Sequence, residues 1–266
     1  MKTKKLTEKQ LAYIAKYELD KLLSVKNVQS PPEYNTFDTV DPSYKDLFYI
    51  DWSDLIFLHQ NIINHKFINV LEYGIGYSTL VMAHALSINE KKYKKIVSSD
   101  FRKTMLFKCV SLDNDKKYVD FYKKKVINMN KVNKNLVLSH SPTYVTQINN
   151  KICTLHKNMP NFSPDFIYLD GPSNYNHTGD INGFNFEGVD KVPNAADILL
   201  LEYALMPGCK IIIDGRKTNG RFLKNNLQRT WSYREDEVND KCILILDEKP
   251  IGKYNRAQMN FQKTTK

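Results

Sequence analysis

Residues 71–79 read Leu71-Glu72-Tyr73-Gly74-Ile75-Gly76-Tyr77-Ser78-Thr79. The apolar run Phe67–Glu72 before the glycines predicts a β-strand, and residues Ser78–Ser87 after them predict a helix. Glycine allows a tight turn and lets a ligand approach the backbone with no β-carbon in the way. The start of the helix adds free N–H groups, and Ser78 or Thr79 is suited to cap it. This strand–loop–helix stretch therefore predicts a loop that binds a nucleotide cofactor.

Signals for strands and helices alternate through the rest of the chain. Further strands are predicted at Phe107–Leu112, Asn135–Ser139, Asp165–Leu169, Lys210–Ile213 and Cys242–Leu246. Helices are predicted between them at residues 118–126, 194–206 and 221–227. The polar, lysine-rich residues 88–106 give a weaker signal, in which Lys95–Asp100 is interpreted as a short strand or extended segment. The alternation predicts an α/β, Rossmann-like three-layer sandwich with a mostly parallel sheet between two layers of helices.

The regions before and after this alternating part are predicted to be additions to it. Thr7-Glu8-Lys9-Gln10 has the form of a capping box, and apolar residues at helical spacing extend the helix to residue 25. The Pro31-Pro32 pair ends this region, and Ser53 is predicted to cap a second helix. We therefore divide the chain into an N-terminal helical and irregular extension at 1–66, which would form a lid over a substrate pocket, a ligand-binding domain at 67–249, and a basic tail at 250–266. The tail lacks apolar periodicity and is expected to be either an appendage or disordered.

Composition narrows the class of protein. No apolar run reaches the roughly 18 residues that a membrane span needs, and no apolar segment follows the basic start of the chain, so we expect a cytoplasmic protein. The four cysteines have neither the spacing nor the neighbouring histidines of a zinc site, and we expect free thiols. The net charge of +10 is compatible with a nucleic-acid partner, but the lysines cluster on predicted helices, where solvated faces are expected.

Two details of the glycine loop separate the possible cofactors. A dinucleotide loop reads G-x-G-x-x-G, and Thr79 stands here in place of the third glycine. An acidic residue, Glu72, stands two positions before Gly74 instead. At the end of the next strand, Asp113 is suited to accept hydrogen bonds from both ribose hydroxyls, and Asp100 competes with it at a more usual spacing from the glycines. We prefer Asp113 because the residues after it form the better amphipathic helix.

Two further aspartates follow predicted strands at the same edge of the sheet. Asp170-Gly171 comes directly after Asp165–Leu169, and Asp214-Gly215 comes directly after Lys210–Ile213. One Asp-Gly pair can simply stabilise a turn, but two pairs on neighbouring strands that face a cofactor loop favour a functional role. A carboxylate at this edge is suited to act as a general base, and Asp170 is the first candidate.

The loops after the third and fourth strands add weaker candidates. His140 follows the third strand, but no partner for it is evident in the sequence. The polar segment 174–185 has the composition of an acceptor-binding loop and equally of an ordinary surface loop. It contains His177, which we take with Asp214 as a second choice for the catalytic group.

Residues 67–247 together resemble the class I S-adenosylmethionine-dependent methyltransferases, nearest the small-molecule branch similar to catechol O-methyltransferase. The resemblance is carried by LEYGIGYST at 71–79, VSLDNDKKYVDFY at 110–122, DFIYLDGPSNY at 165–175 and MPGCKIIIDGR at 206–216. It implies a seven-stranded sheet with a reversed last hairpin, Trp231–Tyr233 and Cys242–Leu246. It also implies S-adenosylmethionine as cofactor, with Asp170 beside the transferred methyl group. The residues expected to contact the cofactor are Glu72, Gly74, Gly76, Ser78, Thr79, Asp113 and Asp170.

The resemblance also bears on metal binding. In the metal-using members of that family, an Asp after the fourth strand and an Asp-Asn pair after the fifth hold Mg²⁺. Asp170 and Asp214 match the two carboxylates, but Gly215 stands where the Asn would be. We therefore expect no metal site, and if Mg²⁺ binds, Asp170 and Asp214 are its expected ligands with water completing the shell.

These features together predict an S-adenosylmethionine-dependent methyltransferase acting at oxygen or nitrogen of a small-molecule or glycan-type acceptor. Three alternatives stay open. The charge favours a nucleic-acid (RNA) methyltransferase, although no base-flipping motif supports it. A nicotinamide-dependent oxidoreductase is disfavoured by the missing third glycine. A non-catalytic scaffold would have no need of the two carboxylates Asp170 and Asp214.

Overall fold

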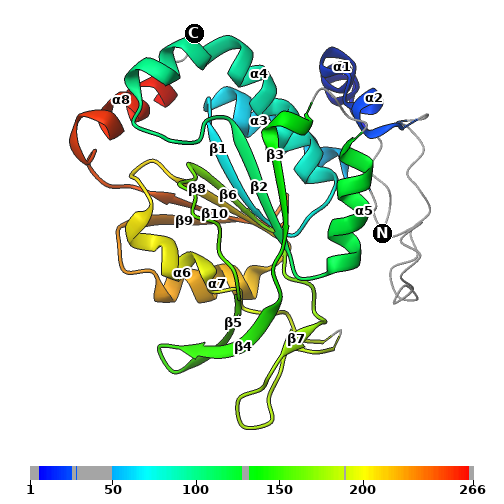
Figure 1. The fold of residues 1–266 in the computed structure, drawn as a ribbon, viewed down its shortest axis with the longest axis vertical. Coiled ribbons are helices and arrows are strands. Elements are labelled where there is room, and N and C mark those ends of the chain that lie inside the picture. The colour runs from blue at the N-terminus through cyan, green and yellow to red at the C-terminus, as the bar shows by residue number, and fades with distance from the viewer. Residues whose placement is uncertain (1–5, 26–27, 29–49, 128–131, 189, 264–266) are drawn as a thin grey trace.

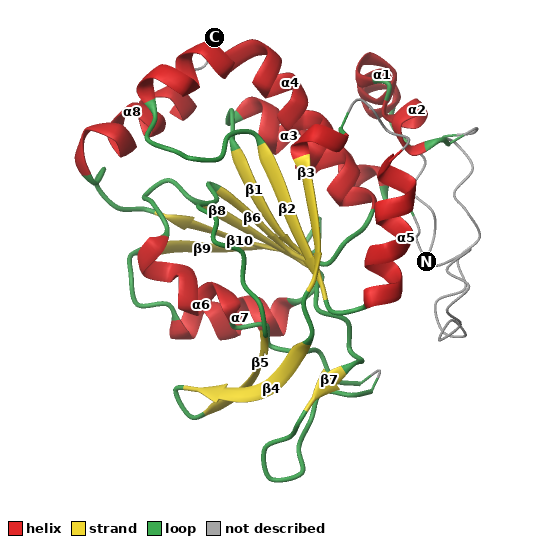
Figure 2. Ribbon diagram, viewed as in Figure 1, coloured by secondary structure: helices red, strands yellow, loops and turns green. Residues whose placement is uncertain are grey.

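The computed structural model describes residues 6–25, 28, 50–127, 132–188 and 190–263. They form a three-layer sandwich in which a seven-stranded sheet lies between helices, with a smaller three-stranded sheet beyond one end of it (Figure 1, Figure 2). The predicted break at Pro31-Pro32 lies outside the described residues. None of the helices within these ranges is long and apolar enough to cross a membrane.

The large sheet has the strand order β3-β2-β1-β6-β8-β10-β9. The strands are β1 Asn69–Tyr73, β2 Lys108–Asp113, β3 Leu136–His140, β6 Phe166–Leu169, β8 Lys210–Asp214, β9 Trp231–Asp236 and β10 Lys241–Leu246. β1 pairs in parallel with β2 and β6, and β6 with β8, whereas β10 runs antiparallel to β8 and to β9. The predicted fold class is confirmed, including the antiparallel last strand. Because the parallel strands finish at one edge, the residues that follow β1, β2, β6 and β8 come together there.

Helices cover both faces of this sheet (Figure 2). On one face lie α3 Trp52–Asn64, α4 Tyr77–Asp100 and α5 Lys116–Ile127, with α1 Glu8–Tyr17 and α2 Leu19–Leu23 packed outside them. On the other face lie α6 Asp197–Leu201, the 3-10 turn η2 Glu202–Ala204 and α7 Lys217–Asn226; a second 3-10 turn, η1 Asn133–Asn135, precedes β3. An apolar core lies on each face of the sheet, and successive residues of β1 point into different cores. Val70 packs in the core beside α3, α4 and α5, and Leu71 and Tyr73 pack in the core beside α6 and α7. The central strand is therefore buried on both sides, as its continuous apolar run predicts.

The crossover between β3 and β6 is a β-hairpin, which the sequence analysis did not predict. It consists of β4 Thr143–Ile148 and β5 Lys151–His156, and β4 also pairs with β7 His177–Thr178 in the small sheet. Asn149 and Asn150 connect the two strands, with φ of 52° and 58°. Two left-handed residues in a two-residue connection are typical of a hairpin turn, and Asn tolerates that conformation well. The Asn-Asn pair between two alternating segments was the signal that could have revealed this hairpin.

Helix α4 is longer than predicted and overturns the expected strand at Lys95–Asp100. The helix continues to Asp100, although its second half has few apolar side chains. Glu, Lys and Ala are strong helix formers, and Lys94 lies 3.3 Å from Glu90 one turn earlier. Val97 is buried and packs in a small apolar cluster with Ile68, Phe101 and Phe107, which holds this half of the helix in place. The residues of this half therefore form a helix because of their helix propensity and one buried apolar contact, although their apolar side chains do not recur at helical spacing.

The N-terminal helices differ from prediction in two places. The Thr7–Gln10 capping box is present, with both hydrogen bonds formed. The helix does not run unbroken to residue 25, because Glu18 takes a left-handed conformation with φ of 51° and separates α1 from α2. The cap of α3 is Asp51 and not Ser53, since the Asp51 carboxylate accepts from the backbone N–H groups of Ser53 and Asp54.

The helix predicted at 194–206 begins only at Asp197. Residues before it pair with the small sheet instead: Thr154 N–H donates to Asn194 O, and Ala196 N–H donates to Thr154 O. The Asp197 carboxylate accepts from the backbone and the ring of buried His156. Hydrogen bonds to β5 therefore replace the first helical turn.

The basic tail is mostly helical in the part that the structure describes, which corrects the expectation from its sequence. Its residues Gly252–Lys263 form α8, which covers the end of the sheet where β1 and β6 begin (Figure 1). Gln258 and Gln262 donate to the buried carboxylate of Asp165, and Lys66 Nζ donates to Phe261 O. Amide hydrogen bonds to one buried carboxylate hold this helix together with Phe261, whose ring packs against Tyr93 and Phe101. These long-range contacts are not visible as apolar periodicity in the sequence.

Candidate functional site

The glycine loop is held from below by the carboxylate of Glu72. This fully buried side chain accepts hydrogen bonds from the hydroxyls of Ser78 at 2.6 Å, Thr79 at 2.5 Å and Ser111 at 2.6 Å. Gly76 N–H donates to Thr79 Oγ1, so Thr79 closes the start of α4, while Ser78 binds Glu72 instead of capping the helix. Burial raises the pKa of Glu72 to about 8, although the three hydroxyls act in the opposite direction. Glu72 therefore ties the loop to α4 and β2 from the inside.

Asp113 lies directly beside the same loop. Its Oδ2 accepts from Ile75 N–H at 2.9 Å, and its Oδ1 accepts from Asp115 N–H at 2.8 Å. Burial raises the pKa of this carboxyl to about 6. Asp100, the competing candidate, is the last residue of α4. Of the two aspartates, Asp113 has the position at the end of β2 that a ribose-binding carboxylate needs.

The turn after β6 is pressed against the glycine loop. The N–H groups of Asp170 and Gly171 both donate to Tyr73 O, at 2.9 and 2.7 Å. A β-carbon on Gly171 would lie 2.7 Å from Gly74 N, and Gly74 itself has φ of +97°. Any side chain at either position would therefore separate the two turns. At Gly76, by contrast, a β-carbon would meet its nearest atom at 3.5 Å, so the fold does not require glycine there.

Asp170 lies at this junction with its side chain accessible to solvent. Desolvation by the surrounding protein and the nearby Asp214 raise its pKa to about 7, against the opposing effect of Arg216 and Lys241. A carboxyl with that pKa can both take up and release a proton near neutrality.

Asp214 has both oxygens engaged. Its Oδ1 lies 2.7 Å from Lys241 Nζ, and its Oδ2 accepts from Tyr168 Oη at 2.6 Å. Lys241 is fully buried and also lies 2.7 Å from Asp54 on α3. Burial and the neighbouring Asp214 raise the pKa of Asp54 to about 6. Lys241 and Asp54 were not predicted from the sequence, where the available signal was a lysine at the start of the apolar strand β10.

These contacts bear on the expected metal ligands. In the described part of the chain, no group of three or more His, Cys, Asp or Glu side chains is arranged to hold a metal ion. The ammonium of Lys241 occupies one oxygen of Asp214, and the Tyr168 hydroxyl occupies the other. With a lysine ammonium and a tyrosine hydroxyl bound to its two oxygens, Asp214 does not fit the role of a Mg²⁺ ligand beside Asp170.

His177 lies on β7 of the small sheet. Its Nδ1 is 2.8 Å from Thr143 Oγ1, and burial lowers the pKa of the ring. The segment before it is fixed to the end of β2, since Asn114 donates to Tyr175 O and accepts from Ser173 N–H. His140 contacts the backbone oxygen of the same Asn114 at 3.2 Å. These hydrogen bonds hold residues 173–175 of the loop after Asp170 against the end of β2.

Arg216 is a further residue of the site that was not singled out from the sequence. Its Nη2 donates to Pro172 O at 2.7 Å, two residues after Asp170. Its Nη1 is buried, with no hydrogen-bond partner among the described residues. Tyr118 on α5 also reaches the site, because its hydroxyl lies 3.9 Å from where a β-carbon of Gly76 would be.

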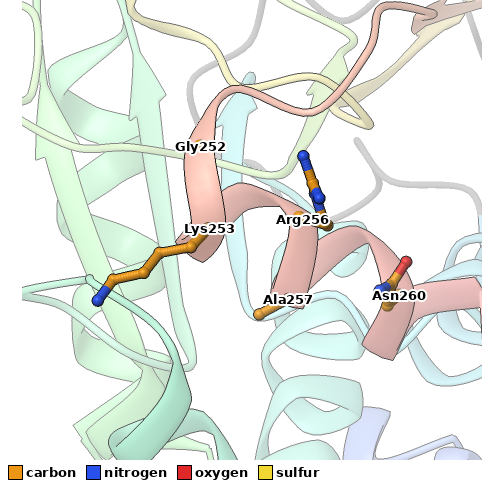
Figure 3. A pocket seen from close by; sticks show the side chains of 5 residues that line it. All are labelled: Gly252, Lys253, Arg256, Ala257 and Asn260. Carbon is orange, nitrogen blue, oxygen red and sulfur yellow. The ribbon is translucent and has the colours of Figure 1, made fainter.

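A pocket of about 410 Å³ lies elsewhere, on α8. It is lined by Gly252, Lys253, Arg256, Ala257 and Asn260. Figure 3 shows the Lys253 and Arg256 side chains pointing in different directions. Since α8 covers the end of the sheet opposite the glycine loop, this pocket is not part of the candidate site.

Comparisons with known proteins show a weak structural similarity between this chain and several solved structures. No family model and no curated protein matches the sequence. Among solved structures, the chain is similar to the O-methyltransferase TomG of Streptomyces achromogenes, in complex with S-adenosylmethionine, at 11% identity over 93% of both chains with a TM-score of 0.40. It is also similar to an O-methyltransferase of Bacillus cereus, at 13% identity over 89% of this chain and 96% of that one with a TM-score of 0.39. A methyltransferase of Podospora anserina matches at 11% identity over 93% and 91% of the chains, with a TM-score of 0.40. At these values the likeness is too weak to assign an activity.

Proposed function

We propose that this protein is an S-adenosylmethionine-dependent methyltransferase that acts at oxygen or nitrogen of a small-molecule or glycan-type acceptor. The observation that carries the proposal is the contact between the glycine loop and the turn at Asp170. Both N–H groups of that turn bind Tyr73 O, directly before Gly74. A carboxyl with a pKa of about 7 therefore adjoins the loop at which the cofactor would bind. Such a group is suited to accept a proton from a hydroxyl or ammonium acceptor.

The electrostatics of the loop favour S-adenosylmethionine over a dinucleotide. The N–H groups of Ile75 and Gly76 already bind Asp113 and Thr79, so they are not free to bind a pyrophosphate. Asp113, whose pKa is about 6, is largely ionised at neutral pH and borders the loop, where it would oppose a phosphate. S-adenosylmethionine has no phosphate and carries positive charge on its sulfonium and ammonium groups, which suits an acidic site.

We assign the cofactor contacts to groups of the loop that are not fully used by contacts within the protein. Gly76 offers backbone without a β-carbon, and Asp113 keeps lone pairs for the ribose hydroxyls. Glu72, Ser78 and Thr79 would act indirectly, because they bind one another beneath the loop. Asp170 would face both the amino-acid end of the cofactor and the acceptor.

The mechanism follows from alignment and proton transfer. When bound, S-adenosylmethionine supplies an electrophilic methyl group on its sulfonium. The chain holds the acceptor in line and excludes water, which is the main requirement of a direct displacement. Asp170 Oδ takes the proton from the acceptor atom as it attacks. Asp214, fixed by Lys241 and Tyr168, is a positioning residue that raises the pKa of Asp170.

Calorimetry with S-adenosylhomocysteine and with NAD tests the cofactor. We expect binding of the first in the micromolar range typical of enzyme ligands, about 10⁻⁶ M, and none of the second. Transfer of a tritiated methyl group to pooled acceptors, separated into small molecules and RNA, then tests the substrate class. Binding of NAD alone, or methylation confined to RNA, would overturn the proposal.

A further inference from the structure

Arg216 is held at the rim of the site by one nitrogen of its guanidinium. It lies two residues after the end of β8, and its Nη2 donates to Pro172 O in the turn that contains Asp170. The side chain as a whole is partly exposed, whereas Nη1 is buried and has no hydrogen-bond partner in the described chain. A buried donor without a partner costs free energy, so the fold keeps it against that cost.

The charge of Arg216 also lacks a directly bound counter-ion. Desolvation lowers its pKa, while Asp170, Asp113 and Asp214 act on it electrostatically in the opposite direction. Within the described ranges, no carboxylate makes an ion pair with it. Asp214, two residues away, is already bound to Lys241 and Tyr168. An anionic group of a bound ligand would supply the missing counter-ion for this guanidinium.

The strand order indicates which ligand would supply the anion for Arg216. Of the proposed cofactor residues, Gly76 lies in the loop after β1 and Asp113 is the last residue of β2. Arg216 follows β8, which lies on the other side of β6 from β1. Asp170, at the end of β6, therefore separates the cofactor side from the side of Arg216. An anion at Arg216 belongs to the molecule that Asp170 deprotonates.

We propose that Arg216 binds a carboxylate or phosphate group of the acceptor, so that the substrate of this protein is an anionic molecule. The inference rests on the proposed function. A guanidinium presents several N–H donors in one plane, which matches both anions and fixes their orientation. Anchored on Pro172, it would place the acceptor atom beside Asp170.

Titration with inorganic phosphate, followed by calorimetry, tests this assignment. The protein is titrated alone and saturated with S-adenosylhomocysteine, as wild type and as the variants Arg216→Gln, Arg216→Lys and Arg256→Gln. We expect Arg216→Gln to weaken phosphate binding by about tenfold or more, and Arg216→Lys to weaken it less, because it keeps the charge but loses the fork. Arg256→Gln removes the same charge from exposed α8 and should bind phosphate as the wild type does.

Each other outcome is decisive. Equal phosphate binding by the wild type and Arg216→Gln overturns the inference, as does absence of phosphate binding by the wild type. A parallel loss of affinity for S-adenosylhomocysteine in Arg216→Gln identifies the cofactor carboxylate as the counter-ion and also overturns it. If the wild type does not bind S-adenosylhomocysteine, the proposed function fails, while the titration without it still decides the role of Arg216. Thermal denaturation verifies folding, and Arg216→Lys carries the test if Arg216→Gln does not fold.

Discussion

Lys241 Nζ lies 2.7 Å from Oδ1 of Asp214, and both belong to the same antiparallel pair of strands. The lysine is fully buried and reaches Asp54 of α3 at the same distance. One ammonium thus joins the N-terminal part of the chain to the edge of the sheet that carries Asp170. The ion pair with Lys241 therefore fixes the position of the Asp214 carboxylate.

Replacing Lys241 by Met should destabilise the protein strongly. The variant leaves two carboxylates close together without the cation between them, and breaking a buried ion pair from one side costs about 3–5 kcal/mol. The free energy of unfolding in urea measures the effect. Lys217→Met is the matched control, because its ion pair with Asp240 is exposed and should leave the unfolding midpoint unchanged. Equal midpoints for the two variants would contradict a central role for Lys241.

Replacing Asp170 by Asn should lower methyl transfer by about 100-fold or more while keeping cofactor affinity. The amide has the same shape but accepts no proton. In the wild type, the rate should rise with pH as the carboxyl ionises, with a midpoint near its pKa of about 7. The pH profile of kcat/KM and calorimetry with S-adenosylhomocysteine check the two parts. A wild-type profile without that rising limb would argue against Asp170 as the base.

Two glycine substitutions should separate folding from cofactor binding. Gly171→Ala places a β-carbon 2.7 Å from Gly74 N, so the two turns must part, and we expect a loss of about 1–3 kcal/mol of stability. Gly76→Ala meets only ordinary contacts and should fold as the wild type does, yet lose cofactor affinity because the new methyl group stands where the ligand approaches. Thermal denaturation and calorimetry on both variants make the comparison. Unchanged affinity in Gly76→Ala would remove this position from the cofactor site.

Replacing Glu72 by Gln should flatten the pH dependence of stability. The folded-state pKa of Glu72 is raised to about 8 from an ordinary 4.5, so the folded state favours the protonated form. Its contribution is complete below pH 4.5 and is lost as the pH rises through 8. Gln imitates the protonated carboxyl at every pH. The wild type should therefore lose stability relative to Glu72→Gln between pH 5 and 8 in urea denaturation, and parallel curves would refute this.

Replacing Asp165 by Ala should release α8 without affecting the site. The carboxylate accepts from Ile68 and Asn69 N–H and from the amides of Gln258 and Gln262. Leaving such donors unsatisfied costs about 3 kcal/mol. Proteolysis should then cleave first in 252–263, with cofactor affinity unchanged. Gln262→Ala, which loses one of these bonds, should lie between the variant and the wild type.

Local patterns in the sequence predicted the strands of the large sheet, most helices and the edge of the sheet at which the candidate site lies. Apolar runs such as Val70-Leu71 mark strands buried on both faces, and the parallel order then brings Gly74, Asp113 and Asp170 to one edge. Patterns failed where polar contacts replace apolar periodicity. The β4–β5 hairpin depends on a two-Asn turn, and α8 depends on two glutamines that bind one distant carboxylate.

The sequence by itself determined the α/β fold class and the residues at the ends of β1, β2, β6 and β8, because strand periodicity and glycine turns are local properties. Only the tertiary structure decided what these residues contact. Asp214 and Lys241 are 27 positions apart, and Asp54 and Lys241 are 187 apart, so no spacing predicts their ion pairs. The same holds for the raised pKa of Asp170 and for Nη1 of Arg216, which has no hydrogen-bond partner within the described ranges, because burial and long-range charge are properties of the packed molecule.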